Sequence, residues 1–124
     1  MYDMIVIGAG AAGCVAAGVA AQNGKNVAVV DKNARIARKV MITGKGRCNV
    51  TNNCDLDTLM KNVVTNGRFL YSAFATFMPS DTMFFFESNG VALKTERGNR
   101  VFPASDKALD VLRVLKDTLR ENNC

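Results

Sequence analysis

The first thirteen residues constrain the fold of this chain most, because a short apolar run leads there directly into a glycine-rich turn. The run is Met4–Ile7 and the turn is Gly8–Gly13, with the sequence GAGAAG. In such a pattern Gly8 permits a tight turn, Gly10 lets the backbone approach a pyrophosphate, and Gly13 lets the next helix pack closely on its strand. The phosphates would lie at the N-terminus of that helix. The pattern therefore predicts a dinucleotide-binding βαβ unit.

The residues after the glycines support this prediction, which a lone GxGxxG would not carry, because such matches arise by chance. Residues Ala11–Asn23 are rich in alanine and are expected to form a helix that can lie close to a sheet. Residues Asn26–Asp31 are then almost entirely apolar, as in a parallel strand buried on both faces. Asp31 ends this strand, where a carboxylate can accept hydrogen bonds from an adenosine ribose. The alternative is an ordinary glycine turn.

A second glycine-containing segment, Ala37–Asn52, combines cationic side chains with short hydrogen-bonding ones. Its glycines and some of its cations are Lys39, Gly44, Lys45, Gly46 and Arg47. The glycines allow close backbone approach, and the cations can neutralise a pyrophosphate or a reduced flavin. From composition alone, a solvated basic loop explains the segment equally well. The glycine-rich turn itself suits nicotinamide and flavin cofactors alike.

Three segments of the chain carry a resemblance to a known family: Gly8–Gly13, then Gly44–Asn52 with the sequence GKGRCNVTN, and Gly98–Ala108 with the sequence GNRVFPASDKA. They resemble the FAD-dependent oxidoreductases that include aminoacetone oxidase-like and bile-acid dehydro-reductase-like flavoproteins. The resemblance covers essentially the whole chain, and the last two segments are the most diagnostic. It implies that the first two segments bind FAD, with Gly44–Asn49 near the pyrophosphate and the flavin. Asp31 departs from the family, which usually has glutamate there, although the shorter carboxylate can still reach a ribose.

The expected cofactor contacts come from the glycine-rich turn, the end of the second strand and the segment that follows it. They are Gly8, Gly10, Ala12, Gly13, Asp31, Lys32, Lys39, Thr43, Gly44, Gly46, Arg47, Cys48 and Asn49. No catalytic residue is assigned, because substrate contacts are expected outside this chain. For Cys48 we favour a plain hydrogen-bonding role over a thiolate stabilised by its neighbour Arg47.

The predicted fold class is α/β: a partial Rossmann-like FAD-binding domain, then short helices, a β-hairpin and a C-terminal helix. Residues 1–54 are expected to form the N-terminal part of the FAD-binding domain, and residues 55–124 to lead into the remainder of a longer protein. Only two strands are expected in the parallel sheet, whereas a stable sheet normally needs three or more. Since members of the resembled family are much longer, we expect this chain to be the N-terminal portion of a larger flavoprotein.

Capping residues and apolar spacing predict the elements after residue 54. Three helices are expected: one capped by Asp55 or Asp57, one over Arg68–Phe77, and one capped by Ser80 or Asp81 and ending at Asn89-Gly90. The apolar stripe of the second helix is Phe69, Leu70, Ala73, Phe74 and Phe77. We expect the phenylalanines between Phe69 and Phe86 to pack in a core rather than to stack on a flavin.

A hairpin and a last helix complete the predicted elements. The hairpin joins Val91–Glu96 to Arg100–Phe102 through a glycine turn, and Pro103 ends its second strand. The last helix is expected to be capped by Ser105 or Asp106. Its apolar face is expected to carry Ala108, Leu112, Leu115 and Leu119, flanked by Val111.

The composition limits the possible surroundings and partners. Sixteen Lys and Arg against eleven Asp and Glu give a net charge of +5, which an anionic cofactor can account for. No nucleic-acid motif is present, and no apolar stretch is long enough to span a bilayer. The four cysteines have no CxxC spacing and the chain has no histidine, so a zinc site is not expected. We therefore expect a cytoplasmic protein with no nucleic-acid partner, no membrane association and no metal.

The leading functional prediction is the FAD-binding N-terminal portion of a flavin-dependent oxidoreductase. Hydride would pass through the flavin, with NAD(P) or oxygen as the acceptor and NAD(P)H as a possible electron donor, and the substrate of the longer protein would be a small molecule. Whether the isolated chain is an enzyme is left open. The rival is a truncated, non-catalytic nucleotide-binding fragment that needs partner strands. A third hypothesis is a small NAD(P)-binding domain. It is less favoured, because it gives no role to Gly44–Asn52.

Overall fold

The computed structural model describes residues 1–124, which divide into two compact units. Unit 1 contains Met1–Cys48 and Asp106–Cys124, and unit 2 contains Asn49–Ser105. Unit 1 is discontinuous in sequence because the last helix of the chain packs against the first one. The units do not have the same bounds as the two regions predicted from the sequence, residues 1–54 and 55–124. Those two regions stay a prediction about the domains of a longer protein.

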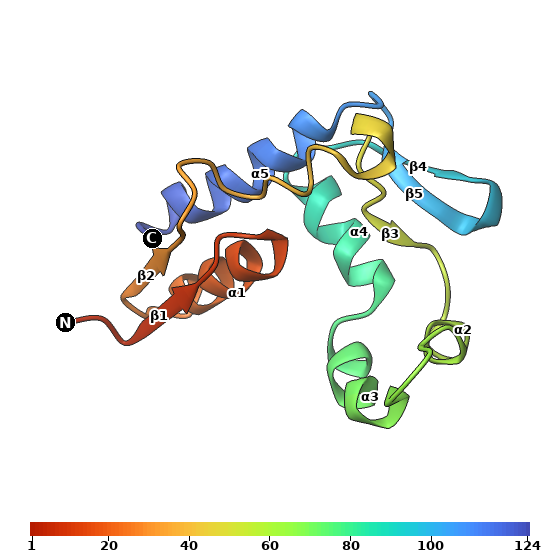
Figure 1. Cartoon of the computed structure of the whole chain (residues 1–124), viewed down its shortest axis with the longest axis horizontal. Helices are drawn as coiled ribbons and strands as arrows, with labels where there is room; N and C mark the ends of the chain where they lie inside the picture. Colours follow the sequence, from red (N-terminus) through yellow and green to blue (C-terminus); the bar gives the residue numbers. More distant parts are fainter. The chain divides into compact units, whose positions relative to one another are not determined.

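Unit 1 opens with the predicted parallel βαβ arrangement (Figure 1). Strand β1 (Met4–Ile7) leads into helix α1 (Ala11–Gln22), and strand β2 (Val27–Val30) returns parallel to β1. The amide of Gly8 donates to the carbonyl of Val30 at 2.8 Å, which anchors the glycine-rich turn to the sheet. The α/β class is confirmed, and each predicted end of these elements agrees with the structure to within one residue.

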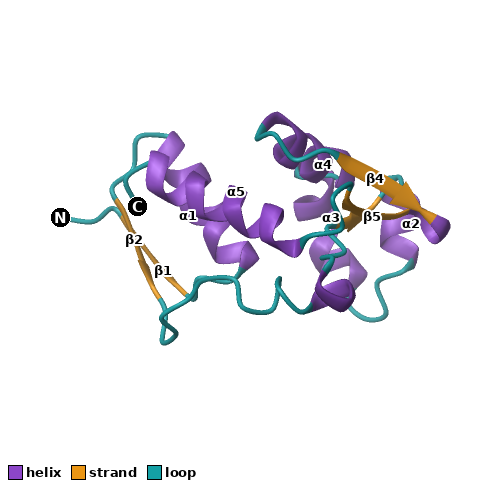
Figure 2. Ribbon diagram, turned by 90° about the horizontal axis from the view of Figure 1, so that it is seen from above, coloured by secondary structure: helices purple, strands orange, loops and turns teal.

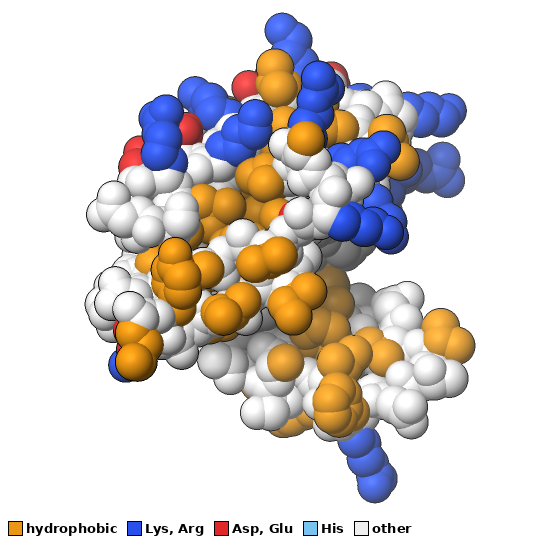
Figure 3. All heavy atoms as spheres, turned by 60° about the vertical axis from the view of Figure 1, so that its left-hand side comes forward, with side chains coloured by type: hydrophobic (Ala, Val, Ile, Leu, Met, Phe, Trp, Pro, Cys, Tyr) orange, Lys and Arg blue, Asp and Glu red, His pale blue; other side chains and the backbone are white.

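The two-stranded sheet of unit 1 leaves apolar side chains at the surface. Hydrophobic side chains reach the surface on the side of the chain shown in Figure 3, and Ile5, Ile7 and Val30 are all exposed, Ile7 to 88%. Parallel sheets are normally covered on both faces and contain more strands. The prediction that this parallel sheet has only two strands is confirmed.

Helix α5 (Ala108–Glu121) lies against α1 within unit 1 (Figure 2). Its buried residues are Ala108, Val111, Val114, Leu115 and Thr118. The apolar face predicted for this helix was partly wrong, because Leu112 and Leu119 are only half-buried. The shorter side chains of Val114 and Thr118 are buried in their place. The reason is that α1 presents the small residues Ala17 and Gly18 at the contact, so the helices approach closely.

The predicted caps of α5 were also wrong, since the N-cap is Lys107 in an extended conformation. Asp106 lies in the left-handed region with φ 58° and turns the chain before the helix begins. Its carboxylate pairs with Arg47 at 3.3 Å. No helix of the chain is both long enough and apolar enough to cross a membrane.

Unit 2 combines three helices with a small antiparallel sheet. Helix α2 covers Leu56–Lys61, α3 covers Gly67–Thr76 and α4 covers Pro79–Ser88. The strands are β3 (Thr51–Asn52), β4 (Leu93–Glu96) and β5 (Arg100–Pro103), in the order β3-β5-β4. The predicted hairpin is confirmed as β4 and β5. Strand β3 was not predicted, because it lies at the end of the segment Ala37–Asn52, which the sequence analysis interprets as a loop near the cofactor.

The helix starts in unit 2 test two capping predictions. Asp55 caps α2 by accepting the amide hydrogen of Thr58 at 2.8 Å, as predicted. The expected cap of α4 at Ser80 or Asp81 was wrong, because Met78 is the N-cap and Pro79 occupies the first helical position. Proline favours this position, since it lacks the amide hydrogen that would be unsatisfied there. Asp81 contributes differently, by accepting the amide hydrogen of Met78.

The phenylalanines of unit 2 only partly form the expected core. Phe86 is 6% exposed and makes an edge-to-face contact with Phe85, at 5.1 Å between ring centroids. Phe69 is 85% exposed, and Phe77 and Phe84 are exposed as well. The prediction of core packing was therefore right for Phe86 and wrong for the α3 stripe at Phe69, because unit 2 places no element over that side chain.

Candidate dinucleotide site

The three glycines of the turn between β1 and α1 have three different surroundings. Gly8 has φ +103°, a backbone conformation that residues with a side chain rarely adopt. A Cβ atom on Gly13 would overlap the carbonyl oxygen of Gly8, so the helix can approach the turn only if this residue is glycine. Gly10 differs from both, because it has φ −75° and ψ 179° and a Cβ there would meet no atom within 4 Å. The fold itself does not need glycine at Gly10, so this position keeps a space open beside the helix N-terminus.

The N-terminus of α1 is open to an anion. Gly10 is the N-cap, no side chain caps the helix, and the first turn contains no acidic residue. Ala11 and Ala12 are exposed there. The first amide groups of a helix have no partner within the helix and carry partial positive charge. The predicted residues Gly8, Gly10, Ala12 and Gly13 therefore lie at or beside an uncapped helix N-terminus, the kind of position where proteins bind pyrophosphates.

Asp31 lies against this turn, immediately after β2. Its Oδ2 accepts the amide hydrogen of Ala9 at 2.7 Å, and its Oδ1 accepts the backbone and side-chain amide hydrogens of Asn33 at 2.7 and 2.9 Å. These three hydrogen bonds lower the pKa of this carboxyl group. The largest effect comes from the Asn33 backbone amide, followed by the Ala9 amide and the Asn33 side chain. A carboxylate offers about four acceptor positions, so one stays available for a ribose hydroxyl. Sequence reasoning found Asp31 but missed Asn33, whose place two residues after an aspartate is typical of an Asx-turn.

The segment after β2 is fastened to the turn by its backbone. The amide of Ala37 donates to the carbonyl of Ala9 at 2.7 Å, and the amide of Cys48 donates to the carbonyl of Thr43 at 3.0 Å. Lys32, Lys39 and Lys45 are exposed on this segment. Gly44 and Gly46 both have positive φ, so the backbone turns sharply there. The predicted cofactor residues up to Cys48 all lie in unit 1, whereas Asn49 begins unit 2.

Arg47 and Cys48 differ in what they offer to a ligand. Arg47 is half-buried and bonded to Asp106, so part of its charge is neutralised within unit 1. Cys48 is 5% exposed, and burial raises the pKa of its thiol, although a hydrogen bond with the Thr43 side chain acts in the opposite direction. A buried thiol with a raised pKa is not a thiolate at neutral pH. This environment agrees with the plain hydrogen-bonding role favoured for Cys48.

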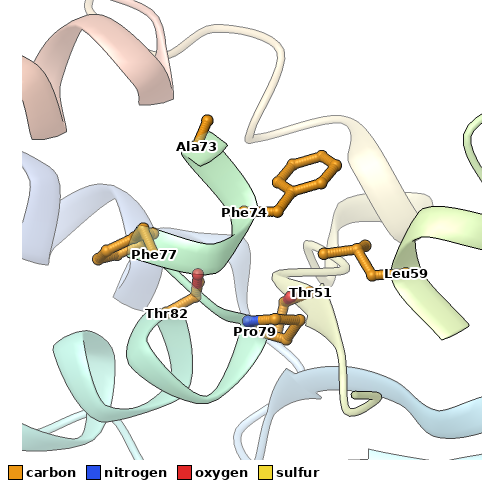
Figure 4. Close-up of a pocket in the computed structure, with 7 residues that line it drawn as sticks. All are labelled: Thr51, Leu59, Ala73, Phe74, Phe77, Pro79 and Thr82. Atoms are coloured by element: carbon orange, nitrogen blue, oxygen red, sulfur yellow. The ribbon is translucent and has the colours of Figure 1, made fainter. Parts of the chain in front are cut away.

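A separate open pocket of about 350 Å³ lies within unit 2 (Figure 4). It is lined by Thr51, Leu59, Ala73, Phe74, Phe77, Pro79 and Thr82. The Thr51 and Thr82 hydroxyls are its only side-chain polar groups, and none of its lining residues is charged. The pocket therefore offers apolar contact and no acid, base or nucleophile of catalytic strength.

The parallel βαβ unit, its glycine turn at a helix N-terminus and the carboxylate after the second strand together define a Rossmann-type nucleotide-binding domain. The chain belongs to the HI0933-like protein Rossmann domain family, whose model matches residues 2–124. The resemblance to flavin-dependent oxidoreductases drawn from the sequence is thereby confirmed at the level of the family.

Three curated relatives have related sequences along most of this chain. A 3-dehydro-bile acid delta(4,6)-reductase of Clostridium scindens is 35% identical over 93% of the chain. Ribosomal RNA dihydrouridine synthases of Escherichia coli and Haemophilus influenzae are 31% and 32% identical over 98% and 92% of it. The chain spans only 28 to 30% of the length of these relatives.

Proposed function

We propose that this chain is the FAD-binding N-terminal portion of a flavin-dependent oxidoreductase that reduces a carbon–carbon double bond conjugated to a carbonyl group. The observation that carries FAD binding is Gly10, which the fold does not require and which keeps the helix N-terminus open. The names of the relatives support the reaction class. A delta(4,6) diene beside a 3-oxo group and the 5,6 double bond of uridine are both double bonds polarised by a carbonyl.

The residues of this chain would hold the cofactor and leave the chemistry to it. The amides at the start of α1 bind the pyrophosphate, Asp31 accepts a ribose hydroxyl, and Lys39 and Lys45 add positive charge on the phosphate and flavin side. When bound, the flavin supplies hydride exchange, with NAD(P)H as the proposed electron donor. Substrate contacts and the proton donor are assigned to the longer protein, and residues 1–54 to its FAD-binding domain.

The first test is the visible absorbance spectrum of the purified chain after incubation with FAD and gel filtration. Retained absorbance at about 370 and 450 nm is expected, because these are the bands of an oxidised flavin. The far-ultraviolet circular dichroism of the same sample reports whether the chain is folded. A folded chain that binds neither FAD nor ADP would contradict the proposal, and it would favour the non-catalytic fragment as the better description.

An RNA substrate is a second candidate in place of a small molecule, and the charge distribution favours it. Unit 1 carries eleven Lys and Arg and six Asp and Glu, whereas unit 2 carries five of each, so the whole net charge of +5 lies in unit 1. Residues 32–47 contain no acidic residue and six cations, which is more positive charge than a pyrophosphate needs. Two of the relatives are named for ribosomal RNA. This candidate differs from the small-molecule substrate and absent nucleic-acid partner expected from the sequence.

Fluorescence anisotropy of a labelled single-stranded RNA, measured over a range of salt concentrations, separates the two substrate classes. If RNA binds unit 1, Arg35→Ala is expected to weaken binding and to reduce the salt slope by roughly 0.7, the value for one lost phosphate contact. The matched control is Arg68→Ala, which removes an exposed arginine from the neutral unit 2. Equal effects of the two variants, or no RNA binding in low salt, would leave the small-molecule substrate as the better candidate.

A further inference from the structure

A relay of hydrogen bonds ends on the candidate ribose-binding carboxylate. Asp31 accepts from the backbone amide of Ala9 and from the backbone and side-chain amides of Asn33. The Oδ1 atom of Asn33 in turn accepts from the Arg38 Nη1 at 2.8 Å. The relay therefore connects the glycine-rich turn, the end of β2 and an arginine from the following segment, all within unit 1.

Arg38 fixes which way the Asn33 amide faces. An asparagine side chain has an acceptor oxygen on one side and a donor nitrogen on the other. Because an arginine can only donate, the oxygen of Asn33 must face Arg38 and the nitrogen must face Asp31. The reversed amide would place its nitrogen against the guanidinium and its oxygen against the carboxylate, and both contacts would be lost.

Asp31 has two tasks. Its Oδ2 holds the amide of Ala9, which lies between the first two glycines of the turn. Its three existing bonds leave about one acceptor position for a ligand hydroxyl. A carboxylate with two rotatable bonds can serve both tasks only if its rotation is restrained, and the Asn33 side chain supplies such a restraint at 2.9 Å.

We propose that Asn33 is a positioning residue for the adenosine ribose: its side-chain amide, oriented by Arg38, holds Asp31 so that one carboxylate acceptor stays free for a ribose hydroxyl. This inference rests on the proposed binding of FAD. Asn33 contacts Asp31 and needs no contact with the ligand. Because the bond from the Ala9 amide to Oδ2 does not involve Asn33, loss of the Asn33 side chain affects recognition of the ribose much more than recognition of the phosphates, which bind at the N-terminus of α1.

The binding test compares ADP with inorganic pyrophosphate, because only ADP contains the ribose. Asn33→Ala is expected to weaken ADP binding about tenfold, in line with the loss of one charge-assisted hydrogen bond, and to change pyrophosphate binding by less than about twofold. Asn33→Ser, whose hydroxyl can still donate, is expected to recover part of the affinity. The matched control is Asn62→Ala in unit 2, which removes an exposed side-chain amide bonded to the Thr58 carbonyl and should change neither affinity.

A second measurement needs no ligand. The carboxyl pKa of Asp31, followed by carbon-13 NMR, is expected to rise in Asn33→Ala, because the variant removes a hydrogen bond that favours the charged form. An unchanged pKa, or equal losses of ADP and pyrophosphate binding, would overturn the inference. If the unmodified chain binds neither ligand, the proposed function fails, while the NMR titration still decides whether Asn33 acts on Asp31.

Discussion

Gly13→Ala is expected to lower the free energy of unfolding by about 2 kcal/mol, as overpacking of a tight contact does, and to abolish FAD retention. The new Cβ would overlap the Gly8 carbonyl oxygen, and it would also lie 3.1 Å from the Gly8 carbonyl carbon and 3.3 Å from the Val6 Cγ1. The turn cannot move away freely, because the Gly8 amide is bonded to Val30 on the neighbouring strand. Urea unfolding followed by circular dichroism gives the stability, and absorbance after gel filtration gives the retained flavin.

Gly10→Ala is the matched control, because it adds the same methyl group three residues away in open space. Its backbone conformation suits alanine, so the free energy of unfolding is expected to stay within about 0.5 kcal/mol of the original. FAD binding should nevertheless weaken by at least about tenfold, since the methyl group takes up space reserved for the pyrophosphate. Full flavin retention in Gly10→Ala, or an unaltered stability in Gly13→Ala, would contradict the distinct roles assigned to the two glycines.

The parts of the site that could be predicted from sequence are those fixed by local conformation. The glycine turn, α1 and β2 follow from glycine spacing, small helix residues and an apolar run, and each of these acts within a few residues. Asp31 was also predictable, because it directly follows a strand. The orientation of the Asn33 amide beside Asp31 was not, since Asn33 is bonded to Arg38 through a contact that no periodicity reveals.

Tertiary contacts explain the predictions that failed. Asp106 is a good capping residue by type, yet it lies in the left-handed region with its carboxylate on the distant Arg47, and the helix begins one residue later with Lys107 as the N-cap. The α3 stripe has the spacing of a buried face, but apolar spacing does not specify whether a partner surface exists for Phe69. The two-residue strand β3 forms only because β5 offers it a free edge. In each case the outcome depends on whether a distant segment provides a partner, which local spacing does not reveal.

Gly18→Ala is expected to destabilise unit 1 by about 2 kcal/mol, as overpacking at a close helix contact does. In an exposed helix this change would instead stabilise by about 1 kcal/mol, because alanine is the better helix former. Here the added Cβ would overlap the Thr118 Cγ2 on α5. Thr118 cannot easily turn away, since it is buried and its hydroxyl donates to the Val114 carbonyl at 2.9 Å.

The double variant Gly18→Ala with Thr118→Ser is expected to recover the stability that Gly18→Ala loses. Serine lacks the Cγ2 atom but keeps the hydroxyl, and the next nearest atoms to the new Cβ are the Cβ and carbonyl oxygen of residue 118, at the ordinary contact distances of 3.6 and 3.9 Å. Thr118→Ser alone should cost about 1 kcal/mol for one buried methyl group. A double-mutant cycle from urea unfolding measures the coupling, which is expected to exceed about 1 kcal/mol. If the two changes were simply additive, the close approach of α1 and α5 would not be the reason for glycine at position 18.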